Sequence, residues 1–333
     1  MELLKKQLIQ DKASTLAVLG QATQIEEVME QEKPLPKVAV VILNYNGRDY
    51  LRDFLPSVEK SSYPNLDIIV ADNASDDGSI VLLENEFPKV QLIKMDENHG
   101  FAEGYNQALK SVHADYFVLL NSDVETTENW IDPIIELMER DKTVGACQPK
   151  ILSFHEKGKF EYAGASGGYM DKWAYPFSRG RIFDSLEEDK GQYDTSEEVF
   201  WATGAAMFVR AELFKNLGGF DGDFFAHWEE IDFCWRLKRA GYKVMVKPKS
   251  VVYHVGGGTL DYDNPRKVFL NFRNSLISIL KNEKPNRYFS LIFWRLILDG
   301  VAGFRFLSQG KFKHVQAIIQ AHWSFFGTYS HHK

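Results

Sequence analysis

Four apolar segments in the first 123 residues each end abruptly in a polar or glycine-containing loop. The clearest is Tyr116 to Leu120, whose five apolar or aromatic residues are typical of a strand buried on both faces; it ends in Asn121-Ser122-Asp123. The other three are Val38 to Leu43, Ile68 to Ala71 and Val90 to Met95. A helix-length segment follows each strand, so the pattern predicts alternating strands and helices that form a largely parallel sheet.

The ends of these strands predict where a ligand binds. In open α/β sheets, ligands lie outside the carboxyl ends of parallel strands. We therefore expect four side chains that are distant in the sequence to converge at one edge of the sheet: Asn44, Asp72, Asn98 and Asp123. Taken alone, Asn121-Ser122-Asp123 fits better as a turn that caps a helix beginning near Thr127. The repetition of polar loops at successive strand ends favours a binding site instead.

The residue types at this edge suit a nucleotide. Asp72 and Asn73 offer an acceptor and an amide for the edge of a base, while Gly100 and Gly104 open a helix N-terminus to phosphate. Neither a Gly-x-Gly-x-x-Gly motif after the first strand nor a Walker-type Gly-Lys-Ser/Thr motif occurs, so the dinucleotide-binding and P-loop classes lose support. An Asx turn at Asp72-Asn73 and a helix entry at Gly100 remain local explanations.

A pair of adjacent acids in the second half is the candidate for acid–base chemistry. Glu229 and Glu230 lie in the first turn of a helix predicted to end near Ala240. Neighbouring carboxylates repel each other, and such crowding commonly raises one pKa toward that of a general base. Asp232, by contrast, is well explained by an i,i+4 pair with Arg236.

Two later residues are candidates for ligand contacts. His254 ends an apolar segment and is followed by three glycines that would let the backbone approach a diphosphate, although a single histidine in such a place is more often structural. Arg273 lies on a helix that begins at Asn264-Pro265, and it could fork onto phosphate oxygens or pair with a surface acid. Between Gly145 and Ala202, alternating apolar residues and many glycines predict β-hairpins.

Length and composition predict a globular chain of 333 residues, with 44% hydrophobic and 26% charged residues. Its two cysteines, Cys147 and Cys234, are far apart and belong to no metal-type cluster, which indicates a reducing, cytoplasmic setting. No apolar run follows Lys5 and Lys6, so we expect no secretory signal. Residues 1–36 have weak helical periodicity, interrupted by prolines, and are predicted to form an N-terminal arm.

The net charge of −7 is unevenly distributed. Residues 281–333 contain eight Lys or Arg and two acids, a net charge of +6, so the preceding 280 residues carry −13. These basic residues are interspersed with Phe, Trp, Leu and Ile, which favours an anionic membrane surface over nucleic acid. We predict amphipathic surface helices at 288–307 and 312–326, with Arg295 and Asp299 on one face of the first. The alternative is that both helices pack as a cap on the catalytic domain.

The ordered set of motifs resembles the family 2 glycosyltransferases of the GT-A fold, and within them the bacterial rhamnosyltransferase-like branch that builds cell-envelope polysaccharides. The resemblance covers about residues 37–280 and rests on Asn44-Tyr45-Asn46, Asp72 to Gly78, Asn98 to Phe101, Asn121 to Asp123, Thr203 to Ala206, Gly218 to Asp221, Glu229 to Asp232 and Tyr253-His254. It implies a doubly wound, mostly parallel α/β sheet flanked by helices. The nucleotide-binding half would be 37–125, the acceptor and catalytic half 126–280, and the C-terminal helical extension 281–333.

The resemblance implies inverting transfer of a sugar, such as rhamnose, from a nucleotide-diphosphate sugar to a hydroxyl of a glycan or lipid-linked acceptor. The enzyme would act at the inner face of the cell membrane. Asp72 would hold the base, while Asp123 and His254 would bind a Mg or Mn ion that bridges the diphosphate. Glu230 would deprotonate the acceptor, with Glu229 as the other candidate.

The resemblance also implies a wider set of ligand contacts. Those to the donor are Asn44, Asn46, Asn73, Asn98, Gly100, Asn121, Ser122 and Arg273, and those to the acceptor are Trp201, Gly204 and Trp228. The sequence departs from the family at two motifs. Asn-Ser-Asp replaces Asp-x-Asp, so one carboxylate is missing, and Glu-Glu replaces Glu-Asp or Asp-Asp.

The chemistry of glycosyl transfer requires the same two groups. A leaving nucleotide diphosphate gains negative charge that a divalent cation stabilises, and a sugar hydroxyl needs a carboxylate to take its proton. Two alternatives stay open: a sugar-nucleotide nucleotidyltransferase and a non-catalytic carbohydrate-binding or scaffold protein of the same fold. The nucleotidyltransferase needs a Gly-rich loop with Arg and Lys after the first strand, of which Asn44 to Arg48 gives only a fragment. The sequence is compatible with a homo-oligomer.

Overall fold

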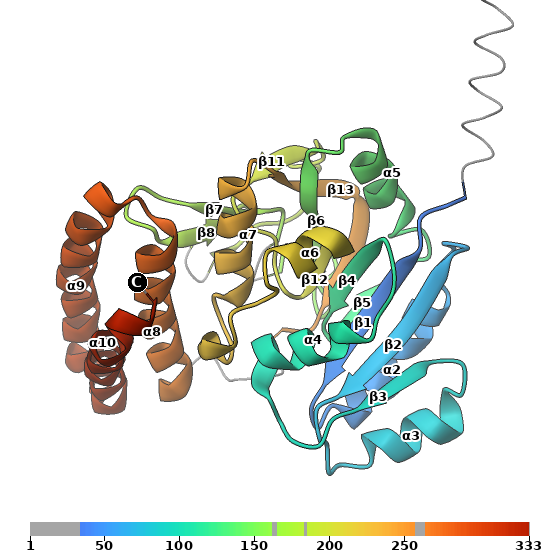
Figure 1. The fold of residues 1–333 in the computed structure, drawn as a ribbon, viewed down its shortest axis with the longest axis horizontal. Coiled ribbons are helices and arrows are strands. Elements are labelled where there is room, and N and C mark those ends of the chain that lie inside the picture. Colours follow the sequence, from blue (N-terminus) through green and yellow to red (C-terminus); the bar gives the residue numbers. More distant parts are fainter. Residues whose placement is uncertain (1–33, 162–164, 183–184, 257–263, 333) are drawn as a thin grey trace, which may run out of the picture. The chain divides into compact units, whose positions relative to one another are not determined.

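The computed structural model describes residues 34–161, 165–182, 185–256 and 264–332 (Figure 1). Contacts divide the chain into two units, Met1–Pro36 and Lys37–Lys333. Most of the predicted N-terminal arm, residues 1–33, lies outside the described residues. The second unit contains the sheet and all the helices described below.

The first half of the sheet is parallel, in the order β3-β2-β1-β4. Its strands are β1 (Val38–Asn44), β2 (Leu66–Asp72), β3 (Gln91–Lys94) and β4 (Tyr116–Leu120). The helices between them are α2 (Arg48–Glu59), α3 (Ser79–Glu86) and α4 (Gly100–Lys110). The predicted alternation of strands and helices is therefore confirmed, and the register places Asn44 directly beside Asp72.

The second half of the sheet is mixed. Beyond β4 the order continues β12-β6-β13-β11, and β12 runs antiparallel to both β4 and β6. These strands are β6 (Val144–Ser153), β11 (Glu197–Val199), β12 (Ala206–Arg210) and β13 (Lys243–His254). The helix considered near Thr127 does not form there. Instead β5 (Val124–Thr126) pairs with β13, and α5 (Asp132–Arg140) begins later.

The pairing of β5 with β13 matters for the site, because it aligns Val124 with His254 and so brings Asp123 beside the end of β13. The hairpins predicted between Gly145 and Ala202 also form. They are β7 (Gly168–Met170) with β8 (Pro176–Ser178), and β9 (Arg181–Ile182) with β10 (Ser185–Leu186).

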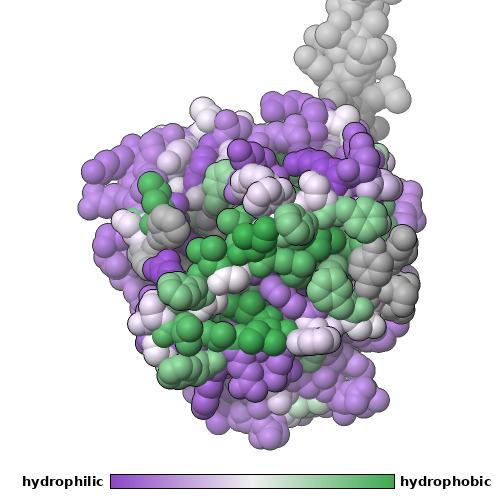
Figure 2. All heavy atoms as spheres, turned by 90° about the vertical axis from the view of Figure 1, so that its left-hand side faces the viewer, coloured by the Kyte–Doolittle hydropathy of each residue, from purple (hydrophilic) through white to green (hydrophobic). Residues whose placement is uncertain are grey.

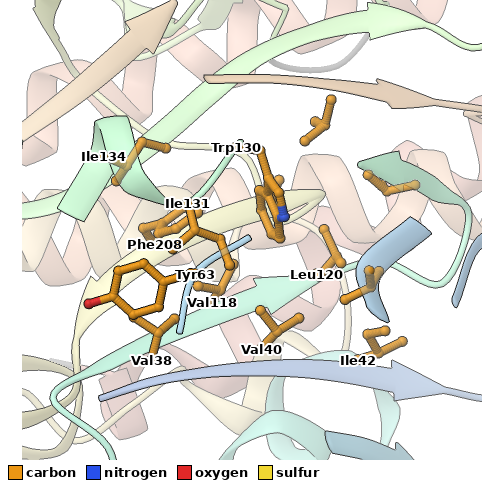
Figure 3. Close-up of a cluster of buried hydrophobic side chains, with 14 of the residues drawn as sticks. Val38, Val40, Ile42, Tyr63, Val118, Leu120, Trp130, Ile131, Ile134 and Phe208 are labelled. Atoms are coloured by element: carbon orange, nitrogen blue, oxygen red, sulfur yellow. The ribbon is translucent and has the colours of Figure 1, made fainter. Parts of the chain in front are cut away.

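Helices cover both faces of the sheet. Along β1, Val38, Val40 and Ile42 point to one face and Ala39 and Val41 to the other, as expected of a strand buried on both sides. The first face packs against α2, α3 and α5; the second packs against α4, α6 (Ala211–Asn216) and α7 (Glu229–Arg239). Figure 3 shows the first core, where β1 and β4 side chains lie below the buried Trp130 ring.

Three C-terminal helices pack on one another beside the sheet (Figure 1). They are α8 (Pro265–Asn282), α9 (Pro285–Ser308) and α10 (Phe312–His332). Asn264 caps α8, since its side chain accepts a hydrogen bond from the Arg266 amide at 2.9 Å. A separate hydrophobic cluster joins them to the body and includes Phe224, Leu276, Leu291 and Phe325. No helix in the described part of the chain combines the length and the apolar character needed to cross a bilayer.

Candidate active site

A cavity of about 280 Å³ lies at the carboxyl ends of β1, β2 and β4. Seven of the predicted site residues line it: Asn46, Asn73, Asn98, Gly100, Asn121, Ser122 and Asp123. The topology brings these residues together because the four strands are parallel and their following loops emerge at one edge. The cavity lies where Asn98 and Asp123 were expected to converge.

Asn44 and Asp72 lie behind the cavity wall and do not line it. Both are fully buried, and the Asn44 amide donates to Asp72 Oδ2 at 2.9 Å and to Ser75 Oγ at 3.1 Å. Asp72 Oδ1 accepts from the Ser75 backbone amide at 2.9 Å. The pair therefore fixes the two loops that carry Asn46 and Asn73, and both Asp72 oxygens already have partners inside the protein.

The Asn73 side chain connects the second and third loops. Its amide donates to Asn98 Oδ1 and to the Gly100 carbonyl, both at 3.0 Å, while its oxygen accepts from the His99 amide at 3.0 Å. Gly100 has φ 77°, and a Cβ at this position would lie 2.6 Å from the Phe225 ring. Only glycine fits here. The missing side chain lets the N-terminus of α4 lie against the segment that follows η1 (Gly222–Phe224).

Asp123 lines the cavity and contacts His254, which lies behind the lining residues. Asp123 Oδ1 lies 3.1 Å from His254 Nε2, and His254 Nδ1 lies 3.4 Å from Glu161 Oε1. Burial lowers the pKa of His254, but the two carboxylates raise it by more, to about 10. Burial raises the pKa of Asp123, but the His254 charge and hydrogen bond outweigh it and leave that pKa below its usual value.

The donor atoms of this pair fit a divalent cation. Two ligands at about 2.1 Å from an ion and at right angles to each other are separated by about 3 Å, close to the 3.1 Å found between Asp123 and His254. Glu161 lies 3.4 Å from the other imidazole nitrogen, the side from which carboxylates orient metal-binding histidines. No cluster of three or more His, Cys, Asp or Glu able to hold an ion occurs among the described residues, so further ligands would have to come from a substrate or water.

A strained segment forms part of the cavity wall. Phe225, His227 and Trp228 all have positive φ, at 62°, 67° and 78°, which is rare for residues other than glycine. Such strain persists only where surrounding structure holds it, and it concentrates at functional sites. Phe225 and Ala226 line the cavity, and the segment leads directly into α7.

Asn274 of α8 holds this segment in place. Its fully buried amide lies 3.1, 3.0 and 2.7 Å from the carbonyl oxygens of Phe224, Ala226 and His227. The neighbouring Arg273 donates to the carbonyls of Asp223 and Phe224. Arg273 thus contacts the backbone beneath the site and does not line the cavity, unlike the phosphate contact expected for it.

Glu229 and Glu230 begin α7, immediately after the strained segment. Burial and the neighbouring Glu230 carboxylate raise the pKa of Glu229 well above its usual value, and burial raises the pKa of Glu230 to about 7. Each has one buried carboxylate oxygen without a hydrogen-bond partner among the described residues. Glu229 is 4% exposed, whereas Glu230 is partly exposed and therefore the more accessible of the two.

The position of Glu229 relative to β4 follows from Tyr105. Glu229 contributes to raising the pKa of the Tyr105 phenol, and that phenol donates to the Leu120 carbonyl at 3.1 Å, one residue before Asn121. Glu229 therefore lies near the Tyr105 phenol, which contacts the last residue of β4. The predicted pairing of Asp232 with Arg236 is confirmed at 2.8 Å.

The residues expected to contact an acceptor have structural roles in part. The Trp201 indole donates to the Tyr169 carbonyl at 2.9 Å and lies against Gly168, while Trp228 is buried as the residue that precedes α7. Gly204 lies in the turn before β12, where a Cβ would be 3.3 Å from the Phe101 ring. None of the three lines the cavity.

Several residues of the site were not predicted from the sequence. Tyr45, Tyr50, Phe225 and Arg266 line the cavity, and the Arg266 guanidinium lies 4.8 Å from the centre of the Phe225 ring. The position of Arg266 had a signal in the sequence, because it follows the Asn264-Pro265 helix start. Glu161 and Asn274 had none, since their partners are far away in the sequence.

The chain belongs to glycosyl transferase family 2, whose model matches residues 39–218. The N-acetylglucosaminyl-diphospho-decaprenol L-rhamnosyltransferase of Mycobacterium tuberculosis is 24% identical over 230 residues, which are 65% of this chain and 75% of that protein. The O-antigen biosynthesis protein RfbC of Myxococcus xanthus is 25% identical over 66% of this chain but only 17% of its own length. The predicted family and enzyme class are therefore confirmed.

Solved structures confirm the GT-A fold. A mannosyltransferase from Pyrobaculum calidifontis in complex with GDP-Man and Mn²⁺ has a TM-score of 0.51 and 16% identity, over 94% of this chain and 96% of its own. GalNAc-T7 with UDP, GalNAc and Mn²⁺ has a TM-score of 0.57 and 16% identity, over 75% of this chain and 48% of its own.

Proposed function

We propose that the chain is a metal-dependent inverting glycosyltransferase that moves a hexose from a nucleotide-diphosphate sugar to an acceptor hydroxyl. One observation carries the proposal. Asp123, which contacts His254, lines the same cavity as Phe225 and Ala226, and the segment of these two residues leads directly into Glu229 and Glu230. A cation site and a general base are the two groups that this reaction needs.

The donor would lie along the polar loops of the cavity. Asn46, Asn73 and Asn98 offer amide groups to the nucleotide, and Arg266 offers a guanidinium to the diphosphate. Asp123 and His254 would hold a Mg²⁺ or Mn²⁺ ion, which when bound neutralises charge on the leaving diphosphate. The solved relatives that contain Mn²⁺ together with UDP or GDP-Man support this assignment.

Glu230 is the proposed general base. The acceptor oxygen forms its bond to the anomeric carbon as the bond from that carbon to the diphosphate breaks, and the hydroxyl proton passes to the Glu230 carboxylate. A pKa of about 7 suits this role because a base acts best when its pKa is near the working pH. Glu229 is less accessible, and burial together with the Glu230 carboxylate raises its pKa well above the usual value, so it keeps its proton more readily than Glu230 does.

The sugar and acceptor are proposed from the relatives. Rhamnose is the first donor sugar to test because the mycobacterial relative is an L-rhamnosyltransferase of a diphospho-decaprenol acceptor. The Myxococcus relative is named for O-antigen biosynthesis. We therefore infer that the acceptor is a glycan or a lipid-linked sugar and that the enzyme works at the cytoplasmic face of the membrane in cell-envelope polysaccharide synthesis.

The test compares Glu230→Gln with wild type in two assays. A thermal-shift screen of thymidine-, uridine- and guanosine-linked sugars with Mg²⁺ or Mn²⁺ identifies the donor, since a ligand at 100 times its Kd stabilises the folded protein by about 2.7 kcal/mol. Transfer to an acceptor is then measured with that donor. We expect Glu230→Gln to keep the thermal shift but to lose transfer by at least about 10²-fold.

Glu136→Gln is the matched control, because Glu136 is an exposed glutamate on α5, away from the cavity. It should leave both assays unchanged. Unchanged turnover in Glu230→Gln would exclude Glu230 as the base. The absence of any nucleotide-sugar shift in wild type would contradict the donor site itself.

A further inference from the structure

The outer side of α9 and α10 carries most of the exposed large hydrophobic side chains in the described part of the chain. Sixteen large hydrophobic side chains are exposed in the described part of the chain, and eleven of them lie on these two helices. We call this surface the α9–α10 face. It consists of Phe289, Phe293, Trp294, Ile297, Val301, Phe304 and Leu307 on α9, and Phe312, Ile319, Trp323 and Phe326 on α10.

The face is continuous along each helix. On α9, Phe289, Phe293, Ile297 and Val301 follow one another at intervals of four residues, which places them along one side. Figure 2 turns this side of the molecule toward the viewer and shows hydrophobic surface gathered across it, with hydrophilic surface around it. Large contiguous apolar patches on a protein surface mark sites of protein or membrane contact.

Buried charges fix this orientation of α9. Arg295 and Asp299 are 3% and 0% exposed, and Arg295 donates to the Ala174 carbonyl at 2.7 Å and to Ser275 Oγ at 2.9 Å. Asp299 accepts from the Tyr175 hydroxyl at 3.2 Å. α9 thus turns its charged side toward the protein and its apolar side outward, the reverse of a helix that faces water. Rotating the helix to hide the apolar side would expose these paired groups and break their bonds.

The exposed charges on α9 and α10 are basic, although Arg287 also pairs at 3.1 Å with Glu283, which precedes α9. Between residues 285 and 328 the only acid is Asp299, which is buried, whereas Arg287, Arg305 and Lys313 are exposed. Arg287 and Arg305 are 18 residues apart, about five helical turns, so they lie along the same edge of the face. A partner that matches this surface must combine an apolar interior with a negatively charged boundary.

We propose that the α9–α10 face lies on an anionic lipid bilayer, with both helices parallel to the membrane plane. Its apolar side chains would enter the boundary between headgroups and acyl chains, and its basic edge would contact anionic headgroups. Trp294 and Trp323 suit this position, because indole rings favour the membrane interface. A second copy of the chain fits less well, since pairing two such faces brings basic edges together and provides no exposed acid to balance them.

The inference concerns a surface away from the cavity and does not depend on the proposed transfer reaction. The test is co-flotation of the full chain with vesicles of phosphatidylcholine alone or mixed equally with phosphatidylglycerol, without donor or acceptor. Wild type should float with the anionic vesicles and less with the neutral ones. Phe304→Glu and Trp323→Glu, which change two of the most exposed side chains, should each reduce the bound fraction about tenfold or more.

Val81→Glu is the matched control, because Val81 is an exposed hydrophobic residue on α3, far along the sequence from α9 and α10. It should bind vesicles like wild type. The double variant Arg305→Gln with Lys313→Gln tests the basic edge separately. It keeps the apolar side chains and should lose the preference for anionic over neutral vesicles. Wild type that does not float, or face variants that float as well as Val81→Glu, would overturn the proposal. A wild-type dimer that the face variants convert to monomer, with no flotation, would assign the face to a second copy instead.

Discussion

Burial raises the pKa of both glutamates at the start of α7. An unfolded glutamate titrates near pH 4.3, whereas burial raises the pKa of Glu230 to about 7 in the folded chain. Between these values the folded state keeps a proton that the unfolded state has lost. The free energy of unfolding therefore falls as pH rises through this window, and the cost is complete above about pH 7.

We expect Glu230→Gln to raise the free energy of unfolding at pH 8 by about 1–3 kcal/mol, because the amide needs no proton to be neutral. At pH 4 the substitution should have little effect. Urea unfolding at both pH values measures the difference, with Glu136→Gln as the exposed control. A Glu230→Gln variant that is equally destabilised at both pH values would show that the carboxylate has a structural role and no titration linked to folding.

The same group sets the expected pH dependence of activity. Glu230 accepts a proton only when ionised, so kcat/KM of the wild type should rise as pH increases through about 7. The pH profile of kcat/KM, measured at saturating metal, checks this. A profile that is flat from pH 6 to 8 would contradict the role of Glu230 even if its substitution lowered activity.

At the scale of elements, the sequence predicted the parallel strands because a central strand needs apolar residues on both faces. Val38 to Ile42 and Tyr116 to Leu120 meet this requirement without interruption. The turn from Phe225 to Trp228 was not predictable in the same way. Its positive φ values are held by Asn274, some fifty residues later, and nothing in the local sequence marks them.

The position of Arg273 illustrates the same limit on sequence reasoning. A guanidinium suits phosphate and backbone carbonyls equally well, so residue type alone does not select between them. Only the packing of α8 beneath η1 shows that its partners are the carbonyls of Asp223 and Phe224. Arg266, the second residue of the same helix, lines the cavity instead.

Asn274 should act as a positioning residue for the turn that leads into α7. Asn274→Ala leaves three buried carbonyl oxygens without this donor, and we expect a loss of about 1–3 kcal/mol in the free energy of unfolding. Since the turn leads into Glu230, kcat should fall more than the KM for the donor changes. Urea unfolding and steady-state kinetics measure the two effects.

Asn271→Ala is the control on the same helix, because Asn271 donates only to the Lys267 carbonyl within α8 among the contacts described. It should change kcat little. If Asn274→Ala lowered stability but left kcat and its pH profile as in wild type, the residue would be structural only.

At the scale of the whole molecule, the C-terminal helices belong to the catalytic body. Asp232 of α7 accepts from Asn282 at 2.7 Å and from Lys281 at 3.2 Å, and Phe224 of η1 packs in the same cluster as Leu291 and Phe325. The sequence placed Arg295 and Asp299 on one face of α9 but left open whether the helices form a surface element or a cap. They pack as a cap, with the charged side of α9 inward, because Tyr175 and Ser275 supply hydrogen-bond partners for it.

The buried pair Arg295 and Asp299 affects both the stability of the C-terminal helices and the direction in which the α9–α10 face points. Arg295→Met leaves Asp299 buried with only the His322 imidazole, 3.2 Å away, as a basic neighbour among the contacts described, and breaking a buried ion pair typically costs about 3–5 kcal/mol. Replacing both residues, Arg295→Met with Asp299→Leu, should recover much of this loss, because two apolar side chains leave no uncompensated charge. Urea unfolding of the three proteins measures the coupling. Vesicle flotation of the double variant then tests what fixes the rotation of α9. If apolar packing alone fixes it, the double variant still binds vesicles. If the double variant is stable but no longer binds, the ion pair determines which side of the helix faces outward.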